Sequence, residues 1–293
     1  MTRIPFFLVL VALSAALALG ACGSDDDDDD SSGGSDTAAS TTATSACHKD
    51  HLPLYQSGKL TVGTDKPAFP PYFVDDDPAN GKGFESAVAY AIADELGFSK
   101  AEVEWTVVPF NASYAPGEKK FDFDVNQISI SPQREKVVDF STPYYEAPQA
   151  IVVPKGSEYA GVTSLDEVKD ARFGVQVGTT SLSALEDIVQ PSSQPQVFND
   201  SNDVVNALKN DQVDAIVVDL PTALYLTAAE IPGSTVAGQF SAPGGDRWGA
   251  LLQKDSELTE CVSQAVDKLR SSGELQELTD KWITEGAGAP ELD

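Results

Sequence analysis

Polar side chains follow several strand-like segments and could together bind a small molecule that carries both charges. Arg134 comes after a run that ends near Ser129. Thr179 and Thr180 lie between the strand-like run RFGVQVG and a predicted helix, and Asp219 closes the run DAIVVD. Ligands of open α/β sheets bind beyond the carboxyl ends of the strands. A guanidinium and a helix N-terminus bind a carboxylate, and a carboxylate binds an ammonium, so these residue types predict a site for a zwitterion.

Each of these positions also has a purely structural interpretation. Arg134 could form a surface ion pair with its acidic neighbours, and such pairs are common and weak. Thr179 and Asp219 could each cap the helix that follows them. Phe69 and Tyr72 could form the aromatic wall of a site or belong to the core. The interpretation as a binding site depends on these complementary types occurring together.

The elements that would position these residues alternate between strands and helices. Strands are expected at 59–63, 103–108, 123–129, 149–153, 172–178, 196–198, 214–219 and 248–253. Helices are expected at 83–97, from 180 onward, and at 203–211, 221–230, 257–271 and 273–285. Apolar residues recur at helical spacing in the first helix, which Gly97 ends. The alternation predicts α/β sheets with helices on both faces.

The composition limits the class of protein. The chain holds 19 Lys and Arg against 46 Asp and Glu, so its formal net charge is −27. Nucleic-acid binding is excluded, because phosphate backbones require a basic surface. Apolar residues make up 41% of the chain, as in globular proteins, and 293 residues exceed one typical core. Two lobes are therefore expected.

The first 46 residues are expected to lie outside the fold. Arg3 precedes an uncharged apolar stretch ending in LGAC, which is typical of a secretory signal and resembles the lipobox of bacterial lipoproteins. We interpret residues 1–21 as a signal peptide and Cys22 as a lipidated residue, with an uncleaved membrane anchor as the alternative. Residues 23–46, rich in Asp, Ser, Thr and Gly, extend from Cys22 as a disordered tether, so that the segment 22–46 precedes the fold. The six consecutive aspartates lack the spacing of a calcium loop.

Two further cysteines lie near the two ends of the predicted folded region. An even pair outside the cytoplasm predicts a disulfide between Cys47 and Cys261. Cys47 with His48 and His51 offers zinc ligands as an alternative, but the spacing matches no usual zinc motif. We expect no metal and no cofactor.

Several segments, in their order along the chain, resemble the bacterial extracellular solute-binding proteins of family 3, the amino-acid-binding components of ABC importers. They lie within residues 57–286 and are GKLTVGTD, GKGFESAVAYAIADELGF, QISISPQREKVVDFSTPYY, FGVQVGTTS, DAIVVD and LTDKWI. The resemblance implies a type II periplasmic-binding-protein fold, α/β in class, in which two crossovers join two lobes around a ligand cleft. Lobe 1 would comprise residues 47–153 and 244–293, and lobe 2 residues 154–243.

The resemblance also implies roles for individual residues. Arg134 would bind the carboxylate of the ligand, and Asp219 would receive its α-ammonium. Three hydroxyl groups would add donors to the carboxylate or the ligand, those of Ser129, Thr179 and Thr180.

The sequence departs from the family pattern at Gln127 and Glu85 and matches it less clearly around Phe69. Phe69 would pack over the side chain of the ligand, but AFPPYF is a residue longer than usual, so Tyr72 or Phe73 could take this part. Gln127 stands where the family commonly has a small residue, and its longer side chain would reshape the pocket. Glu85 replaces a usual aspartate, which we interpret as an effect at the helix start and not as a ligand contact.

The sequence therefore predicts a monomeric, lipid-anchored substrate-binding protein of an ABC transporter, located outside the cytoplasm. It would capture an amino acid, with a weak preference for a polar or acidic one, and deliver it to two permease subunits served by a cytoplasmic ATPase. Alternatives are a ligand-sensing protein that informs a receptor and a periplasmic-type dehydratase. Catalysis would need a positioned acid or base, and the two histidines, His48 and His51, lie at the domain edge, so we expect no enzyme.

Overall fold

A computed structural model describes residues 47–242, 245–283 and 289–293 of the chain. The chain divides into two units, Met1–Thr41 and Thr42–Asp293, and every described residue belongs to the second unit. The predicted signal peptide, Cys22 and the tether fall outside the described ranges. Within those ranges, no helix combines the length and the apolar character that a membrane crossing requires.

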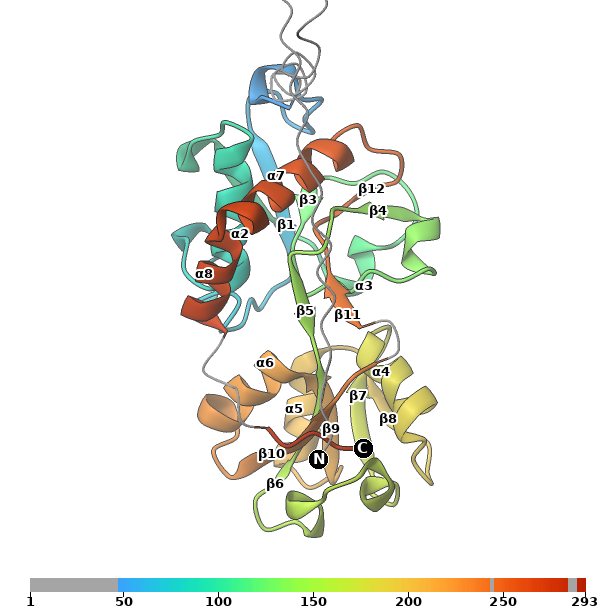
Figure 1. The fold of residues 1–293 in the computed structure, drawn as a ribbon. Helices are drawn as coiled ribbons and strands as arrows, with labels where there is room; N and C mark the ends of the chain where they lie inside the picture. Colours follow the sequence, from blue (N-terminus) through green and yellow to red (C-terminus); the bar gives the residue numbers. More distant parts are fainter. Residues whose placement is uncertain (1–46, 243–244, 284–288) are drawn as a thin grey trace, which may run out of the picture. The chain divides into compact units, whose positions relative to one another are not determined.

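Lobe 1 is built on a mixed five-stranded sheet in the order β2-β1-β3-β12-β4, of which Figure 1 labels all strands except β2. Its strands are β1 (Leu60–Thr64), β2 (Val103–Val107), β3 (Phe123–Asp124), β4 (Val138–Phe140) and β12 (Leu251–Gln253). Its helices are α2 (Phe84–Glu95), α3 (Phe110–Ser113), α7 (Thr259–Ser272) and α8 (Glu274–Trp282). The apolar stripes of α2, α7 and α8 pack on one another and share a core with β1, all of which is buried. This packing fixes the carboxyl ends of β1 and β3.

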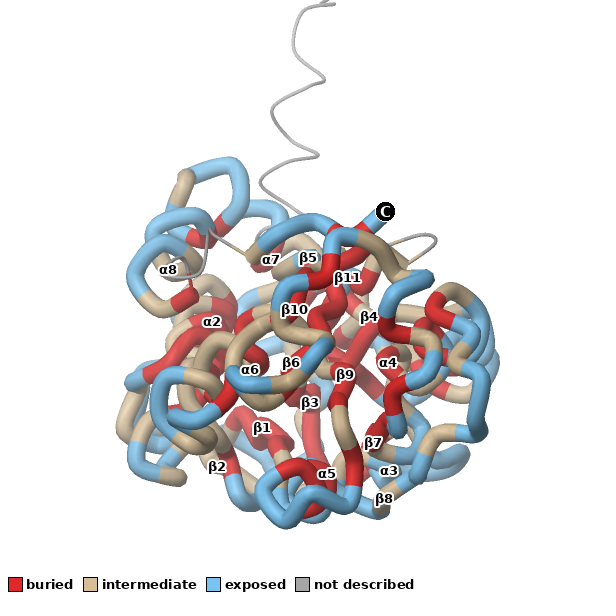
Figure 2. Tube along the Cα trace, turned by 90° about the horizontal axis from the view of Figure 1, so that it is seen from below, coloured by how far each residue is buried: buried red, intermediate tan, exposed pale blue. Residues whose placement is uncertain are grey.

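Lobe 2 is built on a second five-stranded sheet in the order β10-β6-β9-β7-β8. Its strands are β6 (Gln149–Pro154), β7 (Phe173–Gln176), β8 (Gln196–Phe198), β9 (Ala215–Asp219) and β10 (Ser234–Phe240). Its helices are α4 (Thr180–Ala184), α5 (Ser201–Lys209) and α6 (Leu220–Tyr225), and π-helical turns continue α4 and α6 over Leu185–Val189 and Leu226–Glu230. Successive residues of β6 enter two different apolar clusters, because adjacent side chains of a strand point to opposite faces. Figure 2 shows the buried course of β6 inside this covered sheet.

A two-stranded ribbon connects the lobes. It pairs β5 (Tyr145–Ala147) with β11 (Asp246–Trp248) in antiparallel register. β5 leads into β6 of lobe 2, and β11 leads back to β12 of lobe 1. The predicted two-lobed α/β fold is confirmed.

Short 3₁₀ helices occupy Lys49–His51, Pro78–Asn80, Lys100–Glu102, Arg134–Lys136, Glu158–Gly161 and Leu165–Val168.

The described end of the chain, residues 289–293, packs on lobe 2, and β6 also belongs to the lobe 2 sheet, so both segments differ from the lobe bounds 47–153 and 244–293 expected from the sequence. The backbone N–H of Gln239 donates to the carbonyl of Pro290 at 2.8 Å, and that of Leu292 donates to the carbonyl of Gln239 at 2.9 Å. Leu292 is buried in an apolar cluster of lobe 2. It fills the space beside Gly238, where a Cβ atom would lie 2.4 Å from Leu292 Cγ. This tail lies along the outer edge of β10.

The predicted disulfide is confirmed. Cys47 and Cys261 are bonded, with their Cα atoms 5.2 Å apart. Cys261 lies in α7, so the bond ties the start of the described chain to a helix 214 residues further along.

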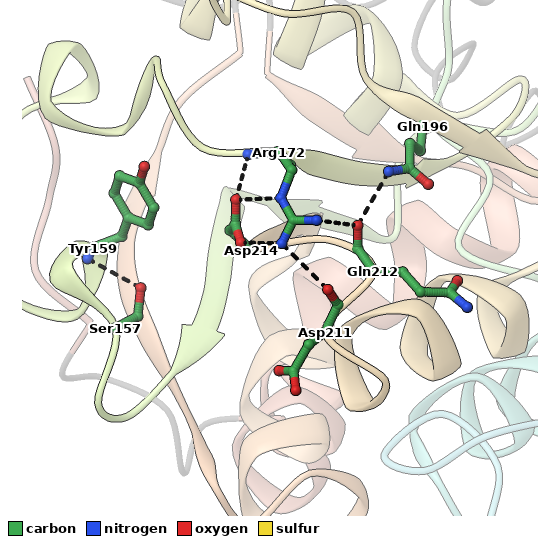
Figure 3. Close-up of polar contacts among 7 residues, drawn as sticks. All are labelled: Ser157, Tyr159, Arg172, Gln196, Asp211, Gln212 and Asp214. Atoms are coloured by element: carbon green, nitrogen blue, oxygen red, sulfur yellow. Dashed lines mark hydrogen bonds and ion pairs between the residues drawn. The ribbon is translucent and has the colours of Figure 1, made fainter.

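Arg172 forms a surface ion pair at the amino ends of β7 and β9 (Figure 3). Nε and Nη2 of Arg172 donate to the two carboxylate oxygens of Asp214, at 2.9 and 2.6 Å. The same guanidinium donates to the carbonyls of Asp211 and Gln212. The hydrogen bond from Arg172 lowers the pKa of Asp214. These residues precede β7 and β9, at the opposite ends of the strands from the predicted site.

Candidate ligand-binding site

A cavity of about 420 Å³ lies between the lobes, at the carboxyl ends of their strands. This volume is within the range of small-molecule sites. Its lining includes every ligand-binding residue predicted from the sequence, namely Phe69, Tyr72, Gln127, Ser129, Arg134, Thr179, Thr180 and Asp219. Their contacts distinguish those that are available to a ligand from those that serve the fold.

Arg134 is buried beside the cavity and is not a surface residue. Its Nη1 donates to the carbonyl of Ser129 at 2.6 Å, and its Nη2 donates to the carbonyl of Gly178 in lobe 2 at 2.9 Å. The guanidinium lies over the rings of Phe110 and Tyr114, at 5.5 and 4.6 Å from their centres. Among the described residues, no carboxylate forms an ion pair with Arg134. A guanidinium has five N–H groups, so donors remain for an anion in the cavity.

The three hydroxyl groups near Arg134 have different roles. Thr179 caps α4: its Oγ1 accepts from the backbone N–H of Leu182 at 3.2 Å and donates to the carbonyl of Gln176 at 2.8 Å. The hydroxyl proton of Thr179 is therefore already used, and the capping interpretation holds for its side chain. Ser129 Oγ and Thr180 Oγ1 lie 3.2 Å apart across the two lobes. Either hydroxyl can turn toward an anion held by Arg134.

Asp219 does not cap α6, although it occupies the capping position. One oxygen of its carboxyl group accepts from Nε2 of Gln149 at 2.6 Å, and the same nitrogen donates to Asp246 at 2.6 Å. Burial and the nearby negative charge of Asp246 raise the pKa of Asp219 to about 8. An ammonium group in the cavity would favour the ionised form, because an opposite charge stabilises a buried carboxylate.

The aromatic residues of the site divide between cavity and core. Phe69 is partly exposed and lines the cavity. Tyr72 is buried, packs edge-to-face on Trp248 with ring centres 5.5 Å apart, and bonds Thr222 of lobe 2 through its hydroxyl at 2.8 Å. Tyr72 thus joins the core of lobe 1 to the other lobe, while Phe69 offers the more open ring.

Gln127 and Glu85 contact each other directly. The backbone N–H of Gln127 donates to Glu85 Oε1 at 2.7 Å, and the side-chain NH₂ of Gln127 donates to Glu85 Oε2. Glu85 is completely buried and also accepts from the hydroxyl of Tyr144. Glu85 therefore does more than favour the start of α2, because its carboxylate accepts two hydrogen bonds from Gln127, which lines the cavity.

Several polar residues of the lining were not predicted from the sequence. Asp65 follows β1 directly, so the rule that selected Arg134 also points to it. Asn126 is buried with no hydrogen-bond partner for its Nδ2 among the described residues. Asp200 and Glu230 line the lobe 2 side. Asp200 follows β8 and caps α5, so the same rule points to it, whereas no local pattern marks Glu230. Within the described ranges, no group of three or more His, Cys, Asp and Glu side chains is arranged to hold a metal ion.

Sequence comparison finds relatives among transport proteins. The sequence profile of the bacterial extracellular solute-binding proteins, family 3, matches residues 60–285. The chain is 30% identical to the L-cystine-binding protein TcyJ of Escherichia coli (strain K12), over 78% of this chain and 84% of that protein. It is 28% identical to the arginine-binding extracellular protein ArtP of Bacillus subtilis (strain 168), over 77% and 86%. It is 29% identical to the glutamine-binding protein GlnH of that organism, over 96% and 97%.

Solved structures of amino-acid-binding proteins also superpose on this chain. An ancestral arginine-binding protein bound to glutamine superposes with a TM-score of 0.66 and 33% identity, over 78% of this chain and 100% of that one. An ancestral amino acid-binding protein, a precursor of cyclohexadienyl dehydratase, superposes with a TM-score of 0.64 and 29% identity, over 78% and 96%.

Proposed function

Because the chain belongs to the bacterial extracellular solute-binding proteins of family 3, we propose that it captures a free amino acid and delivers it to the permease of an ABC transporter. One observation carries the proposal. Arg134 of lobe 1 and Asp219 of lobe 2 line the same cavity, and neither has an ion-pair partner of opposite charge among the described residues. An α-amino acid supplies both missing charges.

The proposed pose follows from the donors and acceptors. Arg134 binds the α-carboxylate with its remaining N–H groups, and Ser129 and Thr180 add hydroxyl donors. Asp219 binds the α-ammonium. Charge-assisted hydrogen bonds of this kind contribute about 1.5 to 3 kcal/mol each, so three of them contribute about 4.5 to 9 kcal/mol and offset much of the cost of immobilising the ligand.

The rest of the lining limits the ligand side chain. Asp65, Asp200 and Glu230 line the cavity, and Lys66 is the other cationic residue of its lining besides Arg134. Glu230 pairs with Lys209 and Lys66 pairs with Asp76, so these two charges are partly neutralised. This excess of carboxyl groups disfavours a ligand amino acid with an acidic side chain. We therefore no longer expect the acidic ligand that the sequence weakly favoured. The relatives that are named for cystine, arginine and glutamine fit a neutral or cationic polar ligand.

Capture would couple to movement of the lobes. The ligand carboxylate and ammonium bridge lobe 1 and lobe 2, where Tyr72 meets Thr222 and Ser129 meets Thr180 across the cavity. A ligand that contacts both lobes stabilises the closed arrangement over an open one. The closed protein would then engage the permease.

The remaining parts of the proposal concern location and partners. We propose that the chain acts outside the cytoplasm as a monomer, held to the membrane by lipid on Cys22 and served by two permease subunits with a cytoplasmic ATPase. The relatives are binding proteins, and we propose binding without catalysis for this chain too. Adjacent permease and ATPase genes would support transport over ligand sensing.

A ligand screen tests the proposal. The domain from residue 47 onward would be heated with each common amino acid and with cystine. A ligand at one hundred times its dissociation constant stabilises the folded state by about 2.7 kcal/mol, so one or a few amino acids should raise the melting temperature clearly. Calorimetry would confirm each hit. The absence of stabilisation by any amino acid would refute the proposal.

A further inference from the structure

Glu85 and Gln127 form a hydrogen-bonded pair between the core of lobe 1 and the cavity. Gln127 lines the cavity, whereas Glu85 is wholly buried. Glu85 Oε1 accepts from the backbone of Gln127 and from Tyr144, and Oε2 accepts from the NH₂ group of Gln127. One side of the Gln127 amide is thus occupied. Among the described residues, its carbonyl oxygen makes no hydrogen bond, so it remains for a partner in the cavity.

The backbone of Gln127 depends on the same carboxyl group. Its φ is +49°, in the left-handed region that residues other than glycine rarely adopt. Such a conformation persists only where its surroundings hold it, and the hydrogen bond from the Gln127 N–H to Glu85 does so here. The position of this side chain in the cavity wall is therefore set by Glu85.

We propose that Glu85 and Gln127 are a specificity-determining pair, in which the proton on Glu85 decides whether the Gln127 amide offers its carbonyl oxygen or its NH₂ group to the ligand. An ionised Glu85 only accepts hydrogen bonds, so the amide must turn its NH₂ group toward it. A protonated Glu85 donates from Oε2, the oxygen with fewer donors. The amide then rotates, its oxygen accepts this bond, and its NH₂ group faces the cavity.

The surroundings allow both forms near neutral pH. Burial raises the pKa of Glu85 to about 7, against the lowering effect of the hydrogen bonds from Tyr144 and Gln127. The titratable groups around it are Tyr144 and Tyr72, both with a raised pKa, and the carboxyl groups of Asp124 and Asp219. Burial raises the pKa of both carboxyl groups as well, so these neighbours do not force either state on Glu85.

The consequence for the ligand rests on the proposed function. With Glu85 ionised, the carbonyl oxygen of Gln127 favours a ligand group that donates, such as a guanidinium. With Glu85 protonated, the NH₂ group favours a ligand group that accepts. Glu85 is a positioning residue, because it acts on the ligand only through Gln127.

A ligand-free measurement tests the pair. The side-chain amide signals of Gln127 in a ¹⁵N–¹H spectrum can be assigned by their loss in Gln127→Met. They should shift with one titration between about pH 5.5 and 8.5. In Glu85→Gln they should keep one position, and in Tyr144→Phe the midpoint should move to higher pH because the ionised form loses a hydrogen bond. Amide signals that do not titrate, or that titrate equally in Glu85→Gln, would overturn the proposal.

A pair of probe ligands tests the specificity. L-Arginine and L-citrulline have nearly the same shape, but citrulline carries an accepting oxygen where arginine only donates, and neither side chain titrates in this pH range. The preference for arginine should grow about fivefold or more from pH 5.5 to 8.5, roughly the effect of one hydrogen bond. This pH dependence should be clearly weaker in Gln127→Met, where only the negative charge gained by Glu85 and Asp219 still acts on the guanidinium. A constant preference in the wild type would overturn the specificity role. Failure of every amino acid to bind would instead count against the proposed function, which the amide titration does not assume.

Discussion

Nη2 of Arg134 in lobe 1 donates a hydrogen bond to the carbonyl oxygen of Gly178 in lobe 2, at 2.9 Å. The same guanidinium lines the cavity, so one side chain joins the lobes and faces the ligand position. A ligand carboxylate on Arg134 would therefore add to a contact that already bridges the lobes. This arrangement makes ligand binding and lobe closure depend on one residue.

Arg134→Ala should weaken amino-acid binding by about 2 to 5 kcal/mol, because the ligand carboxylate would be left without its charged partner. Arg134→Lys should lose less, since it keeps the charge but cannot donate in a fork. Calorimetry with the best amino acid from the screen would measure both. Arg172→Ala is the matched control, because Arg172 also binds a carboxylate and two carbonyls but lies outside the cavity lining. An unchanged affinity in Arg134→Ala would exclude the carboxylate role.

The spacing of apolar residues along the chain was enough to predict the strands and helices in which that spacing is regular. The expected strands at 196–198 and 214–219 correspond to β8 and β9 within one residue, and the helix near 203–211 corresponds to α5. The strands β4, β5, β10 and β11 were not predicted, and β11 shares only Trp248 with the expected strand 248–253. Three of them have only three residues, and β10 carries a register shift between Val236 and Gly238, so none of these strands shows a clean alternation.

The contacts inside the site could be predicted only in part. Residue types at strand ends pointed to the lining, but the bond from Gln149 to Asp219 and Asp246 joins three distant segments. Such contacts depend on strand register and on the crossover ribbon, which local periodicity does not determine. Leu292 left a weak signal as the one large apolar residue in the last five positions, and its partner Gly238 left none.

Ligand binding should release a proton through Asp219. Below about pH 8 the carboxyl group of Asp219 is mainly protonated, because its pKa is raised, and an ammonium would favour the ionised form. Affinity should therefore rise with pH from about 6 to 8. Calorimetry in buffers of different ionisation heat would count the protons. Asp246→Asn should lower the pKa of Asp219 and so reduce the number of protons released on binding at pH 7. Asp219→Asn should abolish the proton release that Asp219 contributes. Equal release in all three proteins would contradict the assignment.

The ligand-free protein should lose stability as the pH rises. Glu85 and Asp219 both have a folded-state pKa raised well above the ordinary value, to about 7 and about 8. The stability that their protonated forms contribute is complete below the unfolded pKa of about 4, and it is lost as pH rises toward those folded values. Melting temperatures between about pH 5 and 8.5 would measure the slope. Glu85→Gln and Asp219→Asn should each flatten it, and a slope of the opposite sign in the wild type would disprove this account.

Removal of the Cys47–Cys261 disulfide should destabilise the fold without changing the ligand. The bond closes a loop of more than two hundred residues, and a bond of this kind typically contributes about 2 to 4 kcal/mol. Neither cysteine lines the cavity. Cys47→Ser should therefore unfold at lower denaturant concentration with unchanged affinity for the amino acid. Reductant should lower the wild-type midpoint to the same value, and a reductant effect on Cys47→Ser would point to another origin.

Contact between Leu292 and Gly238 should hold the chain end on lobe 2. Leu292→Ala should cost about 2 to 4 kcal/mol of stability, because a buried side chain is removed from the apolar cluster. Gly238→Ala should displace the tail, since the new methyl group would meet Leu292. The double variant should be more stable than the two single effects predict, because the smaller side chain leaves room for the methyl group.

Glu291→Ala is the control, as Glu291 is exposed. Hydrogen exchange of residues 289–293 would report release of the tail directly. Strict additivity of the two substitutions would show that these side chains do not share one site.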